Sequence, residues 1–365
     1  MLWQIFSVAD ASGREMLPIL SQVLQHLWIQ SPDSFFWTTT PPEPVVQLSS
    51  PIGVEARQGL VEARQRLVEA RQRLILALRD ALYRQCFARP FIALQASLRA
   101  GIPVCVESDD VSSNLAHQLS AANCGRTTWQ TGWCVQRVDR GGSIVAVKGD
   151  VQRRVQVGDY AMTFSEELLP RVGGAVMLCR RKESLTLQAG VYYAFGDALP
   201  ELDQAGEVLR LYFHASQAAV VPVFETITKD LNTWRVPFTL KTMMRSQDCD
   251  RTDATVLYLP KRCYPRFVDL IHQRSALLSA QLKPEVPLFT KPLCSGIGLA
   301  ESPVTPESFG LHRCRLLAEA IVMAWTNGRQ DEAARLQATE QRFVAEGLSL
   351  NQPYLNPGSE DIYFL

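Results

Sequence analysis

The stretch VLRLYFH (208–214) alternates large apolar side chains with other residues, at the two-residue period of a β-strand that buries one face. Short runs with the same alternation precede it, separated by Gly, Asp and Ser, which favour turns. Such short runs predict a mostly antiparallel sheet that begins near Thr127. The runs are WCVQRV (133–138), SIVAVKG (143–149), RRVQVGDYAMTF (153–164), AVMLCRR (175–181) and SLTLQAGVYYAFG (184–196).

Helical and strand-like periods follow one another downstream of residue 214. This mixture predicts an α+β fold, with a mostly antiparallel sheet domain and flanking helices. The expected elements are a helix over 219–234, strands at 237–241 and 254–259, a helix over 263–282, a Gly/Pro-rich loop from Lys283 to Gly310, and closing helices at 312–325 and 330–347.

The region before the sheet reads as mainly helical, with helices expected at 14–30 and 112–122. A chain of 365 residues is long enough for about two domains. We therefore expect a helical N-terminal region (residues 1–125) followed by an α+β domain (residues 126–365).

One internal repeat lies in the N-terminal region. Residues 54–74 read VEARQGL, VEARQRL, VEARQRL, which places Leu60, Leu67 and Leu74 at one position of a seven-residue period. The repeat predicts a long helix with a Leu/Ala stripe. Two interpretations stay open: the stripe packs on the protein's own surface, or it forms a homo-oligomer or partner contact.

Composition excludes several classes of protein. Hydrophobic residues make up 47% and charged residues 20% of the chain, as in ordinary globular proteins. Lys and Arg (37) balance Asp and Glu (37), so no bulk positive field favours nucleic acid. We find no long apolar segment and expect a cytoplasmic protein that does not enter a membrane. The nine cysteines include no CxxC pair and are expected to be reduced thiols.

The familiar nucleotide, zinc and serine-hydrolase motifs are absent from the sequence. Instead, six cationic residues lie in or beside apolar segments of the second part. Burying a cation is costly without a carboxylate or an anionic ligand, so the group suggests a phosphate site. The alternative is that Asp253, Glu301 and Glu307 neutralise several of them. The six cations are Lys148, Arg210, Lys241, Arg251, Arg313 and Arg315.

Seven strings in this order resemble the HopA-type effector family, which is also found as the lyase component of class V lanthipeptide and thioamitide gene clusters. The resemblance covers about two thirds of the chain, from Gly132 to the C terminus. The strings are GWCVQRV with KGD and GDY (132–160), AGVYYAFGD (189–197), VLRLYFH (208–214), ITKDLNTWRVPFTLK (227–241), RTDATVLYL (251–259), VPLFTKPLCSGIGLAESP (286–303) and ESFGLHRCRLLAEA (307–320).

This resemblance implies a lyase that removes phosphate from phosphoserine or phosphothreonine in a precursor peptide, leaving dehydroalanine or dehydrobutyrine. A partner Ser/Thr kinase would phosphorylate the peptide first, and the resemblance implies no metal or organic cofactor. The family is also similar to the phosphothreonine lyases of animal pathogens, whose spacing of a catalytic Lys and two Arg matches Lys241, Arg251 and Arg313.

Elimination needs a neutral amine base, a proton donor for the leaving group, and cations over the phosphate oxygens. Lys241 is the expected base. The resemblance implies Tyr212 as the acid, because the family commonly has Tyr at this position. His214 is kept as the alternative, because the ordinary pKa of histidine suits a proton donor better. Phosphate would be bound by Arg251 and Arg313, supported by the remaining cations, Arg210, Lys148 and Arg315.

Two other functions remain open from sequence. One is a HopA-like interaction protein that binds a host or regulatory partner and eliminates nothing. The other is a peptide-recognition subunit that acts only with its kinase, docked through the heptad helix. A structure in which Lys241, Arg251 and Arg313 point apart, or are paired with Glu301 and Asp253, would favour the interaction protein.

Overall fold

The computed structural model describes residues 12–32, 34–38, 57–91, 113–163, 169–198, 206–245 and 248–365. A seven-stranded sheet lies at its centre, and every neighbouring pair of its strands is antiparallel. In spatial order the strands are β13 (Lys291–Cys294), β14 (Ile297–Glu301), β10 (Val208–Phe213), β12 (Thr255–Pro260), β11 (Thr239–Met243), β9 (Val191–Phe195) and β8 (Glu183–Ser184).

One face of this sheet is the main core. The alternation in β10 buries Leu209, Leu211 and Phe213 completely on this face. Helices α5 (Val220–Thr233) and α6 (Tyr264–Gln281) cover it, with Phe267 of α6 packing edge-on against Phe213. Helix α4 (Ser113–Ala122) packs on α5, and a short 3-10 turn, η2 (Lys261–Cys263), leads into α6.

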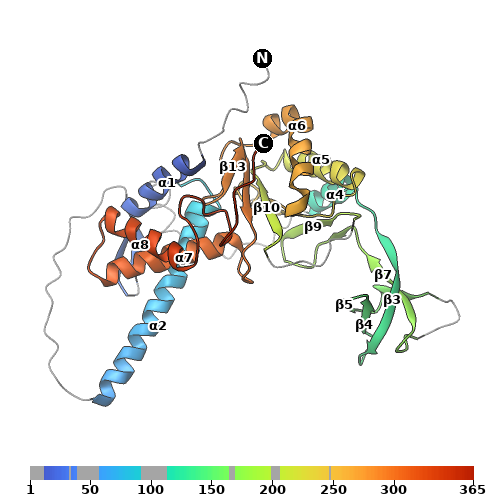
Figure 1. The fold of residues 1–365 in the computed structure, drawn as a ribbon, viewed down its shortest axis with the longest axis horizontal. Coiled ribbons are helices and arrows are strands. Elements are labelled where there is room, and N and C mark those ends of the chain that lie inside the picture. The colour runs from blue at the N-terminus through green and yellow to red at the C-terminus, as the bar shows by residue number, and fades with distance from the viewer. Residues whose placement is uncertain are drawn as a thin grey trace.

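The opposite face of the sheet is covered only in part. Its covered end meets a second helical layer, in which Phe87 packs edge-on against Tyr212 and also contacts Phe309. This layer lies on the far side of the sheet from α5 and α6 (Figure 1). It consists of α1 (Ser12–His26), the hairpin β1 (Leu27–Ser31) and β2 (Ser34–Trp37), α2 (Arg57–Leu82), the π-helix η1 (Tyr83–Phe87), α7 (Phe309–Thr326) and α8 (Glu332–Ala345).

A separate five-stranded antiparallel sheet projects from the body of the molecule (Figure 1). It has its own small core, which includes Trp133, Val135, Ile144 and Leu178. Its strands in spatial order are β5 (Val151–Val155), β4 (Ile144–Lys148), β3 (Thr128–Val138), β7 (Ala175–Arg180) and β6 (Tyr160–Met162).

The predicted α+β fold is confirmed, with mixed helices and three antiparallel sheets. The loop predicted over 283–310 is wrong in part, because β13 and β14 lie within it. Gly296 makes the tight turn between them at φ +73°, and Gly298 sits where a Cβ would come within 2.6 Å of Thr290 Oγ1. These glycines made two short strands look like a loop.

The helix predicted over 14–30 ends four residues early, at His26. The guanidinium of Arg335, which is fully buried, donates to the carbonyls of Leu24 and Leu27 at this end. A buried cation on the last carbonyls of a helix stabilises its termination. The chain then continues as β1, paired with β2.

The heptad helix is present from Arg57 as α2, while Val54, Glu55 and Ala56 and the side chain of Leu60 lie outside the described residues. Leu74 is buried against the body, whereas Leu67 is 61% exposed. The C-terminal half of the stripe therefore packs on the protein itself. An oligomer or partner role for the repeat, and the domain boundary at residue 125, stay predictions. Among the described residues, every helix is too short or too polar to cross a membrane.

Candidate functional site

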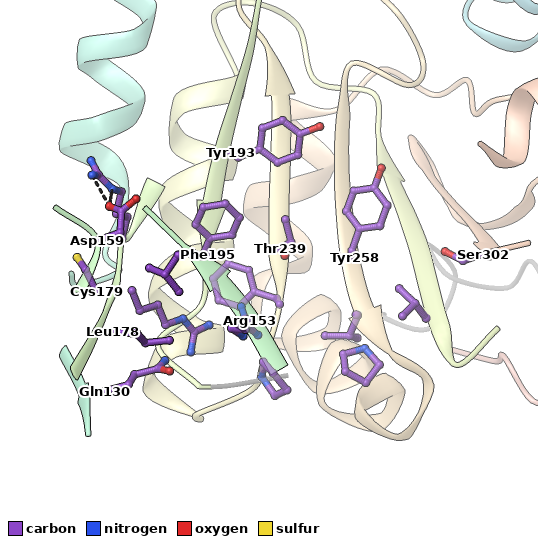
Figure 2. Close-up of a pocket in the computed structure, with 18 of the residues that line it drawn as sticks. Gln130, Arg153, Asp159, Leu178, Cys179, Tyr193, Phe195, Thr239, Tyr258 and Ser302 are labelled. Atoms are coloured by element: carbon purple, nitrogen blue, oxygen red, sulfur yellow. Dashed lines mark hydrogen bonds and ion pairs between the residues drawn. The ribbon is translucent and has the colours of Figure 1, made fainter. Parts of the chain in front are cut away.

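A pocket with a volume of about 930 Å³ lies between the uncovered part of the central sheet and the five-stranded sheet. The central sheet forms its floor, from which Tyr193, Thr239 and Tyr258 point into the space (Figure 2). The five-stranded sheet forms the opposing wall, to which Arg153 and Arg180 belong. A pocket of this size at a junction of two sheets suits a peptide-sized ligand.

Strand register sets the floor. Arg210 of β10 lies opposite Tyr258 of β12, and Tyr258 lies opposite Thr239 of β11 on its other side. Lys241 lies two residues along β11 from Thr239 and directly opposite Tyr193 of β9. Because side chains two residues apart point to the same face of a sheet, these five side chains share one face.

Two cations on this face of the sheet flank one aromatic ring. The Arg210 guanidinium lies 5.3 Å from the centre of the Tyr258 ring, and the Lys241 ammonium lies 5.6 Å from it. Arg210 Nε also donates to Ser302 Oγ at 3.0 Å. Neither cation forms an ion pair with an acidic side chain in the described parts of the chain. This face of the sheet therefore carries two positive charges that no described carboxylate compensates; Arg210 lines the pocket, and Lys241 lies beyond the lining.

The charge of Lys241 affects the pKa of the neighbouring Tyr193 phenol. Burial raises the pKa of its phenol, and the positive charge of Lys241 opposes the rise. The hydroxyl donates to Gln188 Oε1 at 3.0 Å. Tyr193 and Tyr258 are thus the two phenols at the pocket floor beside Lys241.

The wall carries two pairs of adjacent arginines. In the pair from β5, Arg154 contacts Asp139 at 3.1 Å, whereas Arg153 makes no hydrogen bond or ion pair with any described residue. In the pair at the end of β7, Arg181 contacts Asp159 at 2.6 Å, and Arg180 does not form an ion pair within the described ranges. Each pair therefore contains one neutralised and one unneutralised guanidinium.

Arg180 is fixed by neutral acceptors. Its guanidinium donates to the carbonyls of Asp197 and Ala198 at 3.1 and 2.7 Å. Burial lowers the pKa of Arg180, the Asp197 carboxylate opposes that shift, and the charge of Arg153 adds to it. These contacts hold the side chain without cancelling its charge.

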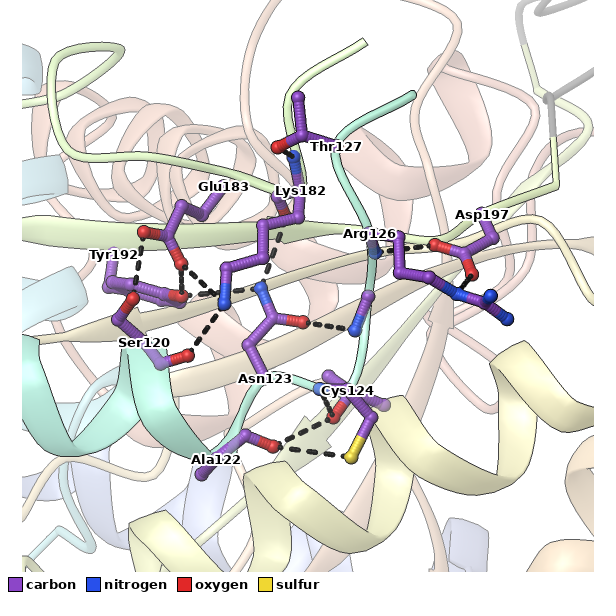
Figure 3. A network of polar contacts seen from close by, with 12 residues as sticks. Ser120, Ala122, Asn123, Cys124, Arg126, Thr127, Lys182, Glu183, Tyr192 and Asp197 are labelled. Atoms are coloured by element: carbon purple, nitrogen blue, oxygen red, sulfur yellow. Dashed lines mark hydrogen bonds and ion pairs between the residues drawn. The ribbon is translucent and has the colours of Figure 1, made fainter. Parts of the chain in front are cut away.

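A polar network connects the central sheet to the chain segments that enter and leave the five-stranded sheet (Figure 3). Asn123 donates to the Lys182 carbonyl and to the Tyr192 hydroxyl, at 3.1 and 3.2 Å. The Asp197 carboxylate accepts from the Arg126 backbone N–H at 2.8 Å, where the chain enters β3. The segments that lead into β3 and out of β7 are therefore anchored at one place on the central sheet. This anchor sets the position of the pocket wall over the pocket floor.

Tyr212 lies on the same face as Arg210 but behind the pocket. It is 3% exposed, between the rings of Phe87 and Phe309. Burial raises the pKa of its phenol well above the usual value, and the Arg210 charge opposes this. Tyr212 therefore contacts the site through Arg210 rather than facing the pocket.

His214, the alternative acid, is outside the pocket lining. It is buried beyond the end of β10, and its Nδ1 lies 3.1 Å from the Glu285 carbonyl and 3.3 Å from the Glu285 carboxylate. The structure brings Lys241, Arg210 and Tyr212 together and leaves His214 apart from them.

Arg251 binds a carboxylate of the protein itself. Its Nε and Nη2 contact the two oxygens of Asp253 at 2.8 and 2.9 Å. Tyr83 donates to the same carboxylate at 2.5 Å and accepts from Arg251 at 3.1 Å. A bidentate pair of this kind occupies the face of the guanidinium that a phosphate would use.

Arg313 is also held internally and is 1% exposed. It donates to the carbonyls of Pro353 and Leu355, at 2.7 and 2.9 Å, and contacts His312 Nδ1 at 2.7 Å. Burial lowers the pKa of Arg313 to about 10. The expected partner Glu301 binds Lys261 instead, at 2.8 Å.

The other two predicted phosphate ligands also lie away from the pocket. Arg315 pairs with Glu307 and Glu319 along α7. Lys148 is exposed on the five-stranded sheet and donates to the Thr131 carbonyl. Internal carboxylates thus neutralise Arg251 and Arg315, as the alternative interpretation of these cations expected.

Sequence reasoning missed four residues of the pocket: Tyr193, Tyr258, Arg153 and Arg180. Tyr193 and Tyr258 occupy the same alternate positions of their strands as Arg210 does in β10, so strand pairing was the signal for them. The arginines come from the second sheet, whose position over the first is not a periodic property of the sequence.

Comparison with known proteins identifies a family. Residues 182–355 match the model of the HopA1 effector protein family. A search of curated proteins gave no match. Two similar solved structures are effector proteins from Pseudomonas syringae, pathovar tomato strain DC3000 and pathovar syringae strain 61, each 12% identical. The match to the first structure has a TM-score of 0.40 and spans 68% of this chain and 83% of that structure's chain. The match to the second has a TM-score of 0.41 and spans 83% of this chain and 98% of that structure's chain. Residues 182–355, which include the whole pocket floor, belong to the HopA1 effector protein family.

Proposed function

We propose that this protein is a carbon–oxygen lyase that eliminates phosphate from phosphoserine or phosphothreonine in a precursor peptide, giving dehydroalanine or dehydrobutyrine. The observation that carries the proposal is the pair of cations on either side of the Tyr258 ring, Lys241 and Arg210, neither of which pairs with a described carboxylate. Arg210 and Tyr258 line the pocket, and Lys241 lies next to Tyr258 on the same face of the sheet. Such a pair offers one guanidinium for the phosphate and one amine for the carbon acid.

In the proposed complex, the phosphate binds to Arg210. Its guanidinium is already oriented by Ser302 and by the Tyr258 ring, so little side-chain entropy is lost on binding. Tyr212 packs behind Arg210 and is a positioning residue in this scheme. The predicted phosphate ligands Arg251 and Arg313 act in it as structural supports of the site.

The elimination step uses Lys241 as base. Its neutral amine takes the proton from Cα, the Cα–Cβ double bond forms, and the bond from Cβ to the ester oxygen breaks. The leaving phosphate takes a proton from a phenol. Tyr258 supplies it in our scheme, because its side chain lines the pocket and its ring lies beside both cations. Tyr212 and His214, like Lys241, are outside the lining, but neither of them contacts both cations in this way. No metal or organic cofactor takes part in these steps.

A kinase must supply the phosphorylated residue before this reaction. We place the protein in the biosynthesis of ribosomally made, post-translationally modified peptides of the lanthipeptide kind, with a Ser/Thr kinase as partner. The product retains the peptide backbone and gains an electrophilic double bond.

The deciding experiment is mass spectrometry of phosphothreonine and phosphoserine peptides incubated with the full chain, with and without a candidate kinase. Lys241→Ala is compared with Lys229→Ala, which removes an exposed lysine from α5. We expect loss of phosphoric acid with the wild type and with Lys229→Ala, and intact phosphopeptide with Lys241→Ala. Intact phosphopeptide with folded wild-type protein under every condition would reject the lyase.

The alternative is a non-catalytic interaction protein that binds a protein partner in the same pocket. The pairing of Arg251 with Asp253 favours it, because that pair removes one expected phosphate ligand. Saturable binding of a phosphopeptide without elimination, in the presence of the kinase, would be the result that supports it.

A further inference from the structure

The pocket carries more positive charge than one phosphate can neutralise. Three cations of its lining form no ion pair with an acidic side chain of the described residues: Arg210 at the floor, and Arg153 and Arg180 on the wall. Lys241 lies outside the lining, beside Tyr258. A bound phosphate monoester brings a charge of about −2. With the phosphate bound to Arg210 as proposed above, Arg153 and Arg180 still have no acidic partner among the described residues.

The wall pair is set apart from the floor by its position. Arg153 comes from β5 and Arg180 from the end of β7, both on the five-stranded sheet across the pocket. The charge of Arg153 contributes to the lowered pKa of Arg180, after burial, so the two guanidiniums are close enough to repel. An anion between them would relieve that repulsion.

The neighbouring arginines provide an internal comparison. Arg154 and Arg181 follow Arg153 and Arg180 directly in sequence, and each contacts an aspartate: Arg154 shares Asp139 with Arg137, and Arg181 pairs with Asp159. The same wall thus contains two neutralised and two unneutralised guanidiniums. Arg180 is moreover fixed at the pocket wall by two backbone carbonyls, which supply no compensating charge.

We propose that Arg153 and Arg180 form a second anion subsite, which binds a further acidic group of the same peptide. This inference rests on the proposed function and names its substrate class: a phosphorylated peptide with a carboxylate or a second phosphate near the reacting residue. Aspartate, glutamate and a second phosphorylated residue share the required chemistry. Lys241 and Arg210 then act on one residue while the wall pair selects its neighbours.

Binding can be measured separately from elimination. The probe is a fluorescein-labelled peptide with a phosphonate analogue of phosphothreonine, in which a methylene replaces the bridging oxygen, so that it cannot eliminate. Three peptides carry glutamates, glutamines or a second phosphonate residue at the flanking positions. Fluorescence anisotropy measures the affinity of each peptide for the full chain. The measurement is made at low salt, because charge pairs are least screened there.

The variants are Arg153→Gln and its matched control, Arg137→Gln. Both remove one exposed arginine from the same sheet, but Arg137 is outside the pocket and pairs with Asp139. We expect the wild type and Arg137→Gln to bind at least one acidic peptide about threefold to tenfold tighter than the glutamine peptide. Arg153→Gln should lose most of that preference, and Arg180→Gln should do the same if it remains folded.

The outcomes separate the two proposals. A preference for glutamate assigns the subsite to carboxylates, and a preference for the second phosphonate alone assigns it to phosphate. Equal affinity for all three peptides, or equal loss in Arg137→Gln and Arg153→Gln, would overturn the subsite even if an ordinary phosphopeptide is eliminated. A charge preference that depends on Arg153, without any elimination, would sustain the subsite and reject the lyase.

Discussion

The Lys241 ammonium lies 5.6 Å from the centre of the Tyr258 ring. The two residues come from adjacent antiparallel strands, and Arg210 approaches the same ring from the strand on the other side. The ring thus separates a proposed base from a proposed phosphate ligand, while its hydroxyl lies on the same face of the sheet. One residue can therefore be tested for two roles, since the ring and the hydroxyl can be changed separately.

We predict that Tyr258→Phe lowers elimination by about 100-fold, which is the contribution of a typical general acid. The ring and its contacts with both cations are retained, so phosphopeptide affinity should change by less than about threefold. Single-turnover rates and anisotropy measure the two quantities. Tyr212→Phe is the comparison, and a larger loss of rate in that variant would return the acid role to Tyr212.

Arg251 is predicted to act on stability and not on phosphate binding. Arg251→Leu leaves the Asp253 carboxylate, which is 5% exposed, with only the Tyr83 hydroxyl. Breaking such a pair should cost about 3 kcal/mol of the free energy of unfolding. Urea denaturation checks this, with Arg266→Gln on the exposed face of α6 as a control expected to stay within about 0.5 kcal/mol. A stable variant with weakened phosphopeptide binding would contradict this assignment.

His312 should make stability depend on pH between about 4 and 6.5. Burial, followed by the charges of Arg313 and Arg315, lowers the pKa of its ring from 6.5 to about 4. Between these values the unfolded chain binds a proton that the folded chain does not, so stability falls as pH decreases through this range, by about 3 kcal/mol in total. Denaturation at several pH values should show the slope in the wild type and in the exposed control His272→Gln. His312→Gln should flatten it.

The C-terminal segment is predicted to depend on Glu301. This carboxylate is 1% exposed and contacts Lys261, the Tyr363 hydroxyl, the Asn356 backbone N–H and the Ser359 hydroxyl. Burial alone would raise the pKa of Glu301, but these contacts lower it below its usual 4.5. Stability from this group is therefore present above that value and decreases as the pH falls below it.

Glu301→Gln should accordingly become sensitive to limited proteolysis near residues 354–363, with fragments identified by mass spectrometry. Glu307→Gln, which removes a half-buried carboxylate that binds Arg315, is the matched control. Cleavage of both variants at the same rate would argue against a special role for Glu301.

The sequence was sufficient for the elements that show a clean period. The alternation in VLRLYFH placed β10 at its correct bounds to within a residue, and the same period put Arg210 and Tyr212 on one face. It also put Lys241 on a strand, and strand pairing then brought it beside Tyr258. Local patterns of this kind are direct consequences of backbone geometry.

Contacts between distant segments were not available from sequence. Asp253 lies only two residues from Arg251, yet whether the pair faces a ligand or the interior depends on η1, from which Tyr83 completes the contact. Arg313 meets carbonyls about forty residues later in the chain. The wall arginines depend on how the second sheet is anchored, which no periodicity encodes.

That anchor has a further consequence for how the pocket is assembled along the chain. Lys241 and every floor residue named here, including Arg210, lie within residues 182–355, and both wall arginines lie before residue 182. In the two proposals above, elimination and the selection of neighbouring residues thus belong to consecutive stretches of the chain, which meet at the contact between Asn123 and Lys182. A chimera in which residues 128–180 are replaced is accordingly expected to keep Lys241 and Arg210 and to change which peptides are bound.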